Sequence, residues 1–201
     1  MIKIVVPGDL LDDKPVHIEH AIIENDKTYA TVLGSYDEEK KRLVPLEGLW
    51  YPVQGDIIIG IVDEEKLNSY SVNLNAPYKG IIVSKFVETQ LQNGDVVEAT
   101  VKEVDKTGTA VLVRSRKLFG GKIIKAKPSK VPRIIGKQDT MLRQLSDGTK
   151  ATIKVGRNGI IWMKGGDVAL ATEAILRIQE EAHTPGLTDR IKEMLSGNNK
   201  V

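Results

Sequence analysis

Short apolar runs that alternate with polar residues dominate the first two thirds of the chain, a pattern that predicts β-strands. The run KIVV ends at the turn signal Pro7-Gly8. The run at residues 21–36 turns at Asn25-Asp26 and then alternates. We therefore expect residues 1–53 to form a small N-terminal β domain. A unit of this size buries little apolar surface by itself.

Residues 54–124 carry several runs rich in valine, isoleucine and threonine, such as QGDIIIGIV and NGDVVEATV. Turn signals at Gly55-Asp56, Asn93-Gly94-Asp95 and Lys106-Thr107-Gly108 separate the runs at the spacing of hairpins. Five strands of this kind predict a small antiparallel barrel, and the OB fold, which binds single-stranded nucleic acids, is the commonest such barrel. A barrel of the SH3 type fits the same periodicity and stays open as an alternative.

The chain changes character at about residue 125, where helical periodicity appears. Two short helices are predicted within VPRIIGKQDTMLRQLSDG. Two strands joined at residues 156–159 follow, and then a long helix capped by Asp167. This order is that of a KH domain, which we assign to residues 125–201. The predicted fold class is a multidomain chain, mainly β with an α/β C-terminal domain: a small N-terminal β domain, a five-stranded OB barrel and a KH domain.

The loop between the two short helices departs from the KH pattern. KH modules clamp RNA with a G-x-x-G loop, whose glycines let backbone amides approach phosphates. Here Gly136 and Lys137 open the loop, but its fourth residue is Asp139. A carboxylate at that point repels phosphate, and it is placed to cap the helix that follows. We expect a KH fold kept for packing and assembly, with a weakened RNA clamp.

Charge is distributed unevenly along the chain, although the net charge is only +2. Counting lysine and arginine against aspartate and glutamate, residues 1–53 carry −4, residues 54–124 carry zero and residues 125–201 carry +6. Residues 114–137 hold nine basic side chains and no acidic one, interleaved with apolar residues. This pattern indicates a folded basic surface, the electrostatic footprint expected for a phosphate backbone.

Several residues are candidate RNA contacts. The basic end of the barrel offers Arg114, Arg116, Lys117 and Lys122 for phosphates, and the middle barrel strands offer Tyr70 and Tyr78 for stacking on bases. The KH segment adds Lys130, Arg133 and Lys137 for diffuse attraction. A solvated edge strand guarded by charge is the alternative for the arginines, and a place in the core is the alternative for either tyrosine. We expect Trp162 in the core or at an interface rather than as a base platform.

Nothing in the sequence indicates catalysis. The chain has no cysteine, which excludes disulfides, thiolate nucleophiles and cysteine-based zinc sites. Its histidines are His17, His20 and His183, and no cluster of further ligands completes a metal site around them. We therefore expect no catalytic residue, no metal and no cofactor. No export signal or membrane span is visible, and we expect a cytoplasmic protein.

The order of these segments resembles the KH-bearing cap subunit of the archaeal exosome. The resemblance covers nearly the whole chain and rests on six stretches in order: VVPGDLL, YPVQGDIIIGIV, NGDVVEATV, RSRKLFGG, VPRIIGK and GRNGIIWMKGG. Members of that family have an N-terminal domain, an OB domain of the ribosomal-protein-S-one type and a KH domain. The other archaeal cap subunit ends in a cysteine zinc ribbon, which this cysteine-free chain cannot form.

The resemblance implies a non-catalytic RNA-binding subunit. In the family, three cap subunits sit on a hexameric ring of phosphorolytic nuclease subunits, held by their N-terminal domains. The cap favours adenine-rich RNA, raises RNA affinity and threads single-stranded 3′ ends toward the ring for 3′-to-5′ degradation. Two other hypotheses stay open: a free-standing OB/KH RNA chaperone or transcription factor, and a self-sufficient nuclease. The acidic N-terminal segment favours a subunit of a nuclease complex over a free-standing RNA binder, because a free RNA binder needs no docking domain.

Overall fold

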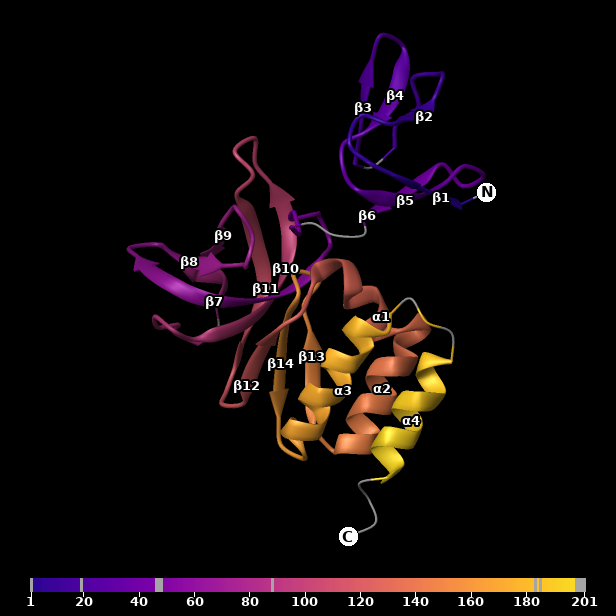
Figure 1. The fold of residues 1–201 in the computed structure, drawn as a ribbon. Coiled ribbons are helices and arrows are strands. Elements are labelled where there is room, and N and C mark those ends of the chain that lie inside the picture. The colour runs from indigo at the N-terminus through magenta and orange to yellow at the C-terminus, as the bar shows by residue number, and fades with distance from the viewer. Residues whose placement is uncertain are drawn as a thin grey trace. The chain divides into compact units, whose positions relative to one another are not determined.

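The computed structural model describes residues 2–18, 20–45, 49–87, 89–182, 184 and 186–197. Its contacts divide the chain into two compact units, Met1–Gly48 and Leu49–Val201. We call them the N-terminal unit and the C-terminal unit and describe each by itself (Figure 1).

The N-terminal unit consists of two small antiparallel sheets. One has the strand order β1 (Ile2–Val5), β5 (Gly34–Asp37), β6 (Arg42–Pro45), and the other β2 (Leu10–Asp12), β4 (Lys27–Ala30), β3 (Ala21–Glu24). The side chains buried in the core of the unit are Val5, Leu11, Ile18, Ala30, Tyr36 and Leu43. The β-rich character predicted for this segment is thus confirmed.

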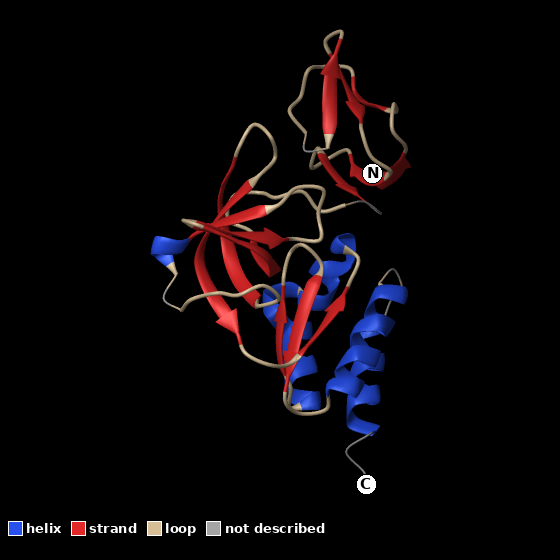
Figure 2. Ribbon diagram, turned by 90° about the vertical axis from the view of Figure 1, so that its left-hand side faces the viewer, coloured by secondary structure: helices blue, strands red, loops and turns tan. Residues whose placement is uncertain are grey.

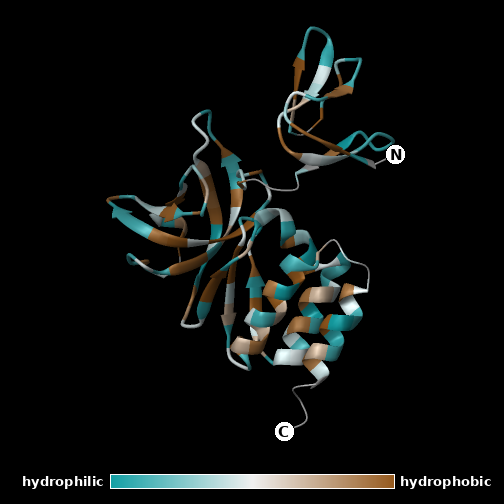
Figure 3. Ribbon diagram, viewed as in Figure 1, coloured by the Kyte–Doolittle hydropathy of each residue, from teal (hydrophilic) through white to brown (hydrophobic). Residues whose placement is uncertain are grey.

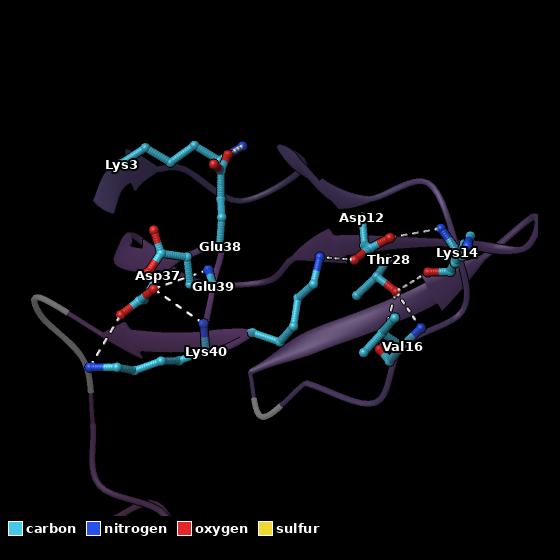
Figure 4. Close-up of polar contacts among 10 residues, drawn as sticks. Lys3, Asp12, Lys14, Val16, Thr28, Asp37, Glu38, Glu39 and Lys40 are labelled. Atoms are coloured by element: carbon cyan, nitrogen blue, oxygen red, sulfur yellow. Dashed lines mark hydrogen bonds and ion pairs between the residues drawn. The ribbon is translucent and has the colours of Figure 1, made fainter. Parts of the chain in front are cut away.

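Polar contacts also hold the N-terminal unit together (Figure 4). Thr28 is fully buried. Its hydroxyl oxygen accepts a hydrogen bond from the backbone N–H of Val16 (2.9 Å) and donates one to the carbonyl of Lys14 (2.8 Å). Lys41, which precedes β6, forms an ion pair with Asp12 on β2. These contacts tie the loop after β2 and the edge of the other sheet to the small core.

The C-terminal unit begins with a closed barrel of five strands: β7 (Ile57–Lys66), β8 (Ser69–Asn73), β9 (Gly80–Val83), β10 (Val96–Val104) and β11 (Ala110–Leu118). The barrel closes through the antiparallel pair β7–β10, and β9 and β11 pair in parallel. Apolar residues at alternating positions of the strands fill its interior. Figure 3 shows the barrel strands as largely hydrophobic with hydrophilic ends. The five-stranded OB barrel predicted from the sequence is confirmed.

A three-stranded sheet with helices follows the barrel. Its strand order is β12 (Lys122–Lys125), β14 (Ile160–Lys164), β13 (Thr152–Val155). The helical elements are η2 (Pro128–Lys130), α1 (Val131–Ile135), η3 (Lys137–Asp139), α2 (Thr140–Thr149), α3 (Val168–Glu180) and α4 (Leu187–Gly197). Figure 2 shows the helices gathered beside this sheet. The Asp167 carboxylate accepts from the Leu170 N–H (2.9 Å), so the predicted cap of α3 is confirmed.

Strand β14 is buried on both faces. Ile161 and Met163 pack with the helices, whereas Ile160 and Trp162 pack with Ile59 and further barrel residues. This division follows from the period of two along a strand. The Trp162 indole N–H donates to the carbonyl of Gly120 (2.7 Å). The expectation that Trp162 belongs to the core or to an interface is therefore confirmed.

Asn158, in the turn between β13 and β14, joins this sheet to the barrel. Its side chain is fully buried and donates to the carbonyls of Ile59 (2.7 Å) and Leu74 (2.8 Å). Its amide oxygen accepts from the N–H of Ile59 (3.3 Å). Lys154 adds an ion pair to Glu98 of the barrel at 2.7 Å. The barrel and the KH part thus form one contiguous unit.

The contacts place two segments differently from the domain boundaries expected at residues 53 and 124. Trp50 packs in the barrel core and donates from its indole N–H to the Asp56 carboxylate (2.9 Å). Strand β12 begins at Lys122 and pairs with β14. These contacts favour boundaries near Gly48 and Lys122, and the three-domain division itself stays a prediction.

Candidate nucleic-acid interface

The basic end of the barrel is built on a β-bulge in β11. Glu98 of β10 faces Arg116 and Thr100 faces Val113, so that Arg114 and Ser115 oppose a single residue. Arg114 takes up the extra length with φ 52, in the left-handed region. Both arginine side chains are exposed, and neither forms an ion pair with any described residue. The bulge therefore presents to solvent two guanidinium groups that no described carboxylate neutralises.

Lys117, next along β11, makes contacts within the protein. Its ammonium lies 2.5 Å from the Asp95 carboxylate and 5.5 Å from the centroid of the Phe119 ring. Burial raises the pKa of Asp95, but Lys117 and the N–H of Gln92 outweigh burial and hold that pKa below its usual value. Lys117 thus has a carboxylate partner within the protein, and its contact with phosphate stays a prediction.

The remaining predicted cations lie on other elements. Lys122 is exposed on β12, in the sheet of the KH part. Arg133 donates from Nε to the carbonyl of Ala182 (2.9 Å), which anchors α1 to the end of α3. Lys130 is half-buried at the end of η2, and Lys137 is exposed in the loop before α2. The structure therefore brings only Arg114, Arg116 and Lys117 together on one strand.

The two predicted stacking residues separate. Tyr70 is only 6% exposed and completes the barrel core, so it offers no ring face to a base, which corrects the expectation from the sequence. Tyr78 is 40% exposed, and its ring lies over Gly108, where a Cβ would meet it at 2.8 Å. The centroid of the Tyr51 ring lies 6.4 Å from that of Tyr78, and Tyr51 is also exposed. Tyr78 and Tyr51 thus form an open aromatic pair.

The loop at residues 136–139 keeps a tight backbone without its second glycine. Gly136 has φ 77, and a Cβ there would meet the Met141 nitrogen at 2.7 Å. Gln138 and Asp139 also lie in the left-handed region, with φ 53 and 62. The expectation that Asp139 caps α2 is wrong, because its side chain makes no capping hydrogen bond. In the left-handed conformation its carboxylate does not reach the N–H groups of the first turn of α2.

Two exposed phenylalanines escaped the sequence reasoning. Phe86, at the end of η1 (Ser84–Phe86), and Phe119, just after β11, are each 60% exposed. They lie at the edge of a cavity of about 440 Å³ whose wall includes Arg114 and Arg116. The available signal was the pair of short basic-aromatic stretches, SKF and RKLF, each at the end of a strand and outside its alternation.

The described residues contain no group of three or more histidine, cysteine, aspartate or glutamate side chains that could hold a metal ion. His183 lies outside the described residues. Within the described part of the chain, no helix is both long and apolar enough to span a bilayer.

Comparison with known proteins decides the family. Residues 121–169 match the family model of the KH domain. The exosome complex component Rrp4 of Pyrococcus abyssi is 37% identical, over 96% of this chain and 82% of the relative. That of Methanothermus fervidus is 35% identical, over 96% of this chain and 94% of the relative. This chain belongs to the Rrp4 family of exosome complex components.

A solved structure agrees with membership in the Rrp4 family. The crystal structure of a protein inferred to be an exosome complex RNA-binding protein superposes with a TM-score of 0.69 at 30% identity, covering 76% of this chain and 98% of that one. The relatives are named as components of a complex, and no catalytic family is indicated. The KH match also begins at residue 121, just before β12.

Proposed function

We propose that this Rrp4-family chain binds single-stranded RNA through the bulged end of its barrel. The observation that carries the proposal is the pair Arg114 and Arg116, exposed and without ion-pair partners among the described residues. Guanidinium groups bind phosphate oxygens in a bidentate manner, and each phosphate that they neutralise releases counterions. A positive groove with nearby aromatic rings is the usual arrangement for binding single strands on an OB barrel.

The KH part is proposed to contribute less to RNA affinity. Asp139 brings a negative charge to the loop that holds phosphates in other KH modules. Arg133 donates to the carbonyl of Ala182, and Lys137 is the exposed cation of this loop. Arg133 keeps its positive charge, because its partner is a neutral carbonyl, and it lies in α1 outside this loop. The charge of Asp139 is thus the reason to propose that the KH fold supports the barrel and the assembly more than it binds RNA.

The assembly we propose is a trimer that caps a hexameric ring of phosphorolytic nuclease subunits, in the cytoplasm. The N-terminal unit would dock on the ring, because its described residues include six exposed large apolar side chains: Ile4, Val6, Leu10, Ile22, Ile23 and Leu33. Contiguous exposed apolar patches mark protein interfaces, and we propose that side chains of this set contribute to one. The cap would raise RNA binding, favour adenine-rich RNA and increase the efficiency of 3′-to-5′ degradation, while the ring performs phosphorolysis.

Two measurements test this function together. Size-exclusion chromatography with ring subunits should shift this chain into the ring fraction, and fluorescence anisotropy should show binding of a labelled single-stranded RNA, tighter for adenine-rich than for uridine-rich sequence. Binding of RNA without co-elution would favour a free-standing RNA chaperone or transcription factor. Co-elution without any RNA binding by the chain or the complex would contradict the RNA-binding role.

A further inference from the structure

The cavity beside β11 has the dimensions of a small-ligand site. Its volume of about 440 Å³ lies within the roughly 300–1,000 Å³ typical of ligand pockets. The lining residues are Phe86, Val87, Thr89, Arg114, Ser115, Arg116, Lys117 and Phe119. The 3₁₀ helix η1, which carries Phe86, is tied to the β7–β8 turn by a hydrogen bond from the Ser84 N–H to the Asn68 carbonyl (3.0 Å). One wall is thus fixed to the barrel, and the other is the barrel strand itself.

Both phenylalanine rings at this cavity are associated with cations. The Lys85 ammonium lies 4.9 Å from the centroid of Phe86, and the Lys117 ammonium lies 5.5 Å from that of Phe119. Large aromatic rings that are 60% exposed are unfavourable in water unless a partner covers them. The described lining residues include Arg114, Arg116 and the Asp95-paired Lys117, and no carboxylate. The matching partner is a flat aromatic group that is linked to negatively charged groups.

A polar group at the wall also lacks a partner. The hydroxyl of Ser115 is buried and makes no hydrogen bond within the described structure. Ser115 occupies the extra position of the bulge, between the two exposed arginines. Buried hydroxyls are normally satisfied, and Ser115 lines the cavity, so rotation about its Cα–Cβ bond would let this hydroxyl bond the edge of a ligand there.

From these observations we infer that the cavity, which we call the Phe86/Phe119 pocket, binds one nucleobase of the single-stranded RNA. The base stacks on the exposed phenylalanine rings, while Arg114 and Arg116 hold the phosphates on either side of it. This inference rests on the proposed function, because it adds a base site to the phosphate-binding strand. The pocket shares no described lining residue with the cavity beside Tyr78, which is lined by residues of β8 and β9, the loop between them, Lys66 of β7 and Thr109.

The test measures binding of two fluorescein-labelled RNAs of equal length, one natural and one whose sugars carry no bases. The variant Phe86→Ala/Phe119→Ala should bind natural RNA about 5- to 150-fold more weakly, the range expected from stacking of one base. Its salt slope should be unchanged, since no charged side chain is removed. On the RNA without bases, variant and parent should bind equally.

Two controls accompany this variant. Phe86→Tyr/Phe119→Tyr retains both rings and should restore affinity for natural RNA to within about twofold of the parent. Leu67→Ala removes a 96%-exposed apolar side chain that does not line the pocket and should leave affinity unchanged. Unchanged fluorescence of the buried Trp50 and Trp162 verifies that each variant is folded.

The outcomes separate the two proposals. Equal affinity of the alanine variant and the parent for natural RNA overturns the pocket, while binding by the parent still supports the RNA-binding function. An equal loss of affinity for both RNAs also overturns the pocket. The rings would then affect binding only by positioning the arginines that bind phosphate, and not by stacking on a base. If the parent binds neither RNA, both proposals fail.

Discussion

The two units of this chain differ in how much of their apolar surface they bury. Among its described residues, the N-terminal unit buries six apolar side chains in its core and leaves six large ones, including Ile4 and Ile22, exposed. The C-terminal unit has three apolar clusters, which fill the barrel, the KH part and the junction between them. A unit of fewer than fifty residues buries a smaller fraction of its surface than a larger unit does, so outside contacts contribute more to its stability. The difference suggests a protein partner for the first unit and RNA for the second.

Removing the N-terminal unit gives the largest expected effect. A chain that begins at Leu49 retains the complete barrel core, including Trp50. The shortened chain should unfold at the same midpoint as the C-terminal unit of the parent, and its RNA affinity should stay within about twofold of the parent's. It should no longer co-elute with the ring subunits. Size-exclusion chromatography and anisotropy measure the two properties side by side. Normal assembly of the shortened chain would show that the C-terminal unit carries the docking surface.

Asn158→Ala should break the continuity of the C-terminal unit. The substitution leaves the Leu74 carbonyl and both backbone groups of Ile59 without this partner. Each buried group left unpaired costs about 1–3 kcal/mol. Urea unfolding followed by Trp50 and Trp162 should show this loss of stability, with separate transitions for barrel and KH part. Asn73→Ala, which removes an exposed contact to the Asn75 N–H, is the control and should change little.

Acid should weaken the N-terminal unit through its carboxylates. The Lys41 ammonium lowers the pKa of Asp12 below its ordinary 3.8, and Lys3 lowers that of Glu38 below 4.5. A carboxyl group whose pKa is lower in the folded than in the unfolded state stabilises the folded state. This stabilisation is complete at a pH above the group's unfolded pKa and is lost as the pH falls through its folded pKa. Stability should therefore decline below about pH 4.5.

Urea titrations at pH 5.5 and pH 3, followed by amide signals of β2 and β5, measure this decline. Lys41→Gln should shrink the difference between the two pH values, because Asp12 then titrates near its ordinary pKa. The effect is modest, since these pairs are exposed and screened by salt. An acid-insensitive N-terminal unit would contradict a stabilising role of these pairs.

Asp139→Gly gives the smallest expected change. Because Asp139 has φ 62 and caps no N–H, glycine removes backbone strain without removing a hydrogen bond. The variant should be as stable as the parent or up to about 1 kcal/mol more stable, and it should bind RNA more tightly. Thermal unfolding and anisotropy measure both. A loss of about 1 kcal/mol would instead indicate a capping role, and Asp139→Ala, which stays strained, is the matched control.

The sequence predicted those features that depend on periodicity and on local chemistry. Alternation gave the barrel strands, and the capping rule gave Asp167 at the start of α3. The sequence does not show which face of a strand points into the barrel. The stacking role expected for Tyr70 was therefore wrong, because its side chain points into the core. The sequence also could not reveal the left-handed backbone at Asp139.

Long-range contacts set a further limit on sequence reasoning. Asn158 reads as an ordinary turn residue, yet its partner Ile59 lies 99 positions away. The bulge at Arg114 depends on the register with β10, which no local pattern contains. The Phe86/Phe119 pocket likewise joins two segments that the chain separates. Contacts of this kind become visible only when the barrel closes.

The salt dependence of RNA binding tests the central claim, that Arg114 and Arg116 bind the RNA backbone, most directly. On single strands each phosphate contact contributes about −0.7 to the slope of log affinity against log salt. Arg114→Ala/Arg116→Ala should therefore flatten the slope by roughly one to one and a half units. Lys102→Ala/Lys106→Ala removes the same charge elsewhere on the barrel and should leave the slope within error of the parent. An unchanged slope in the arginine variant would contradict the account. These arginines would then bind no phosphate and would only be solvated charges on an edge of the barrel.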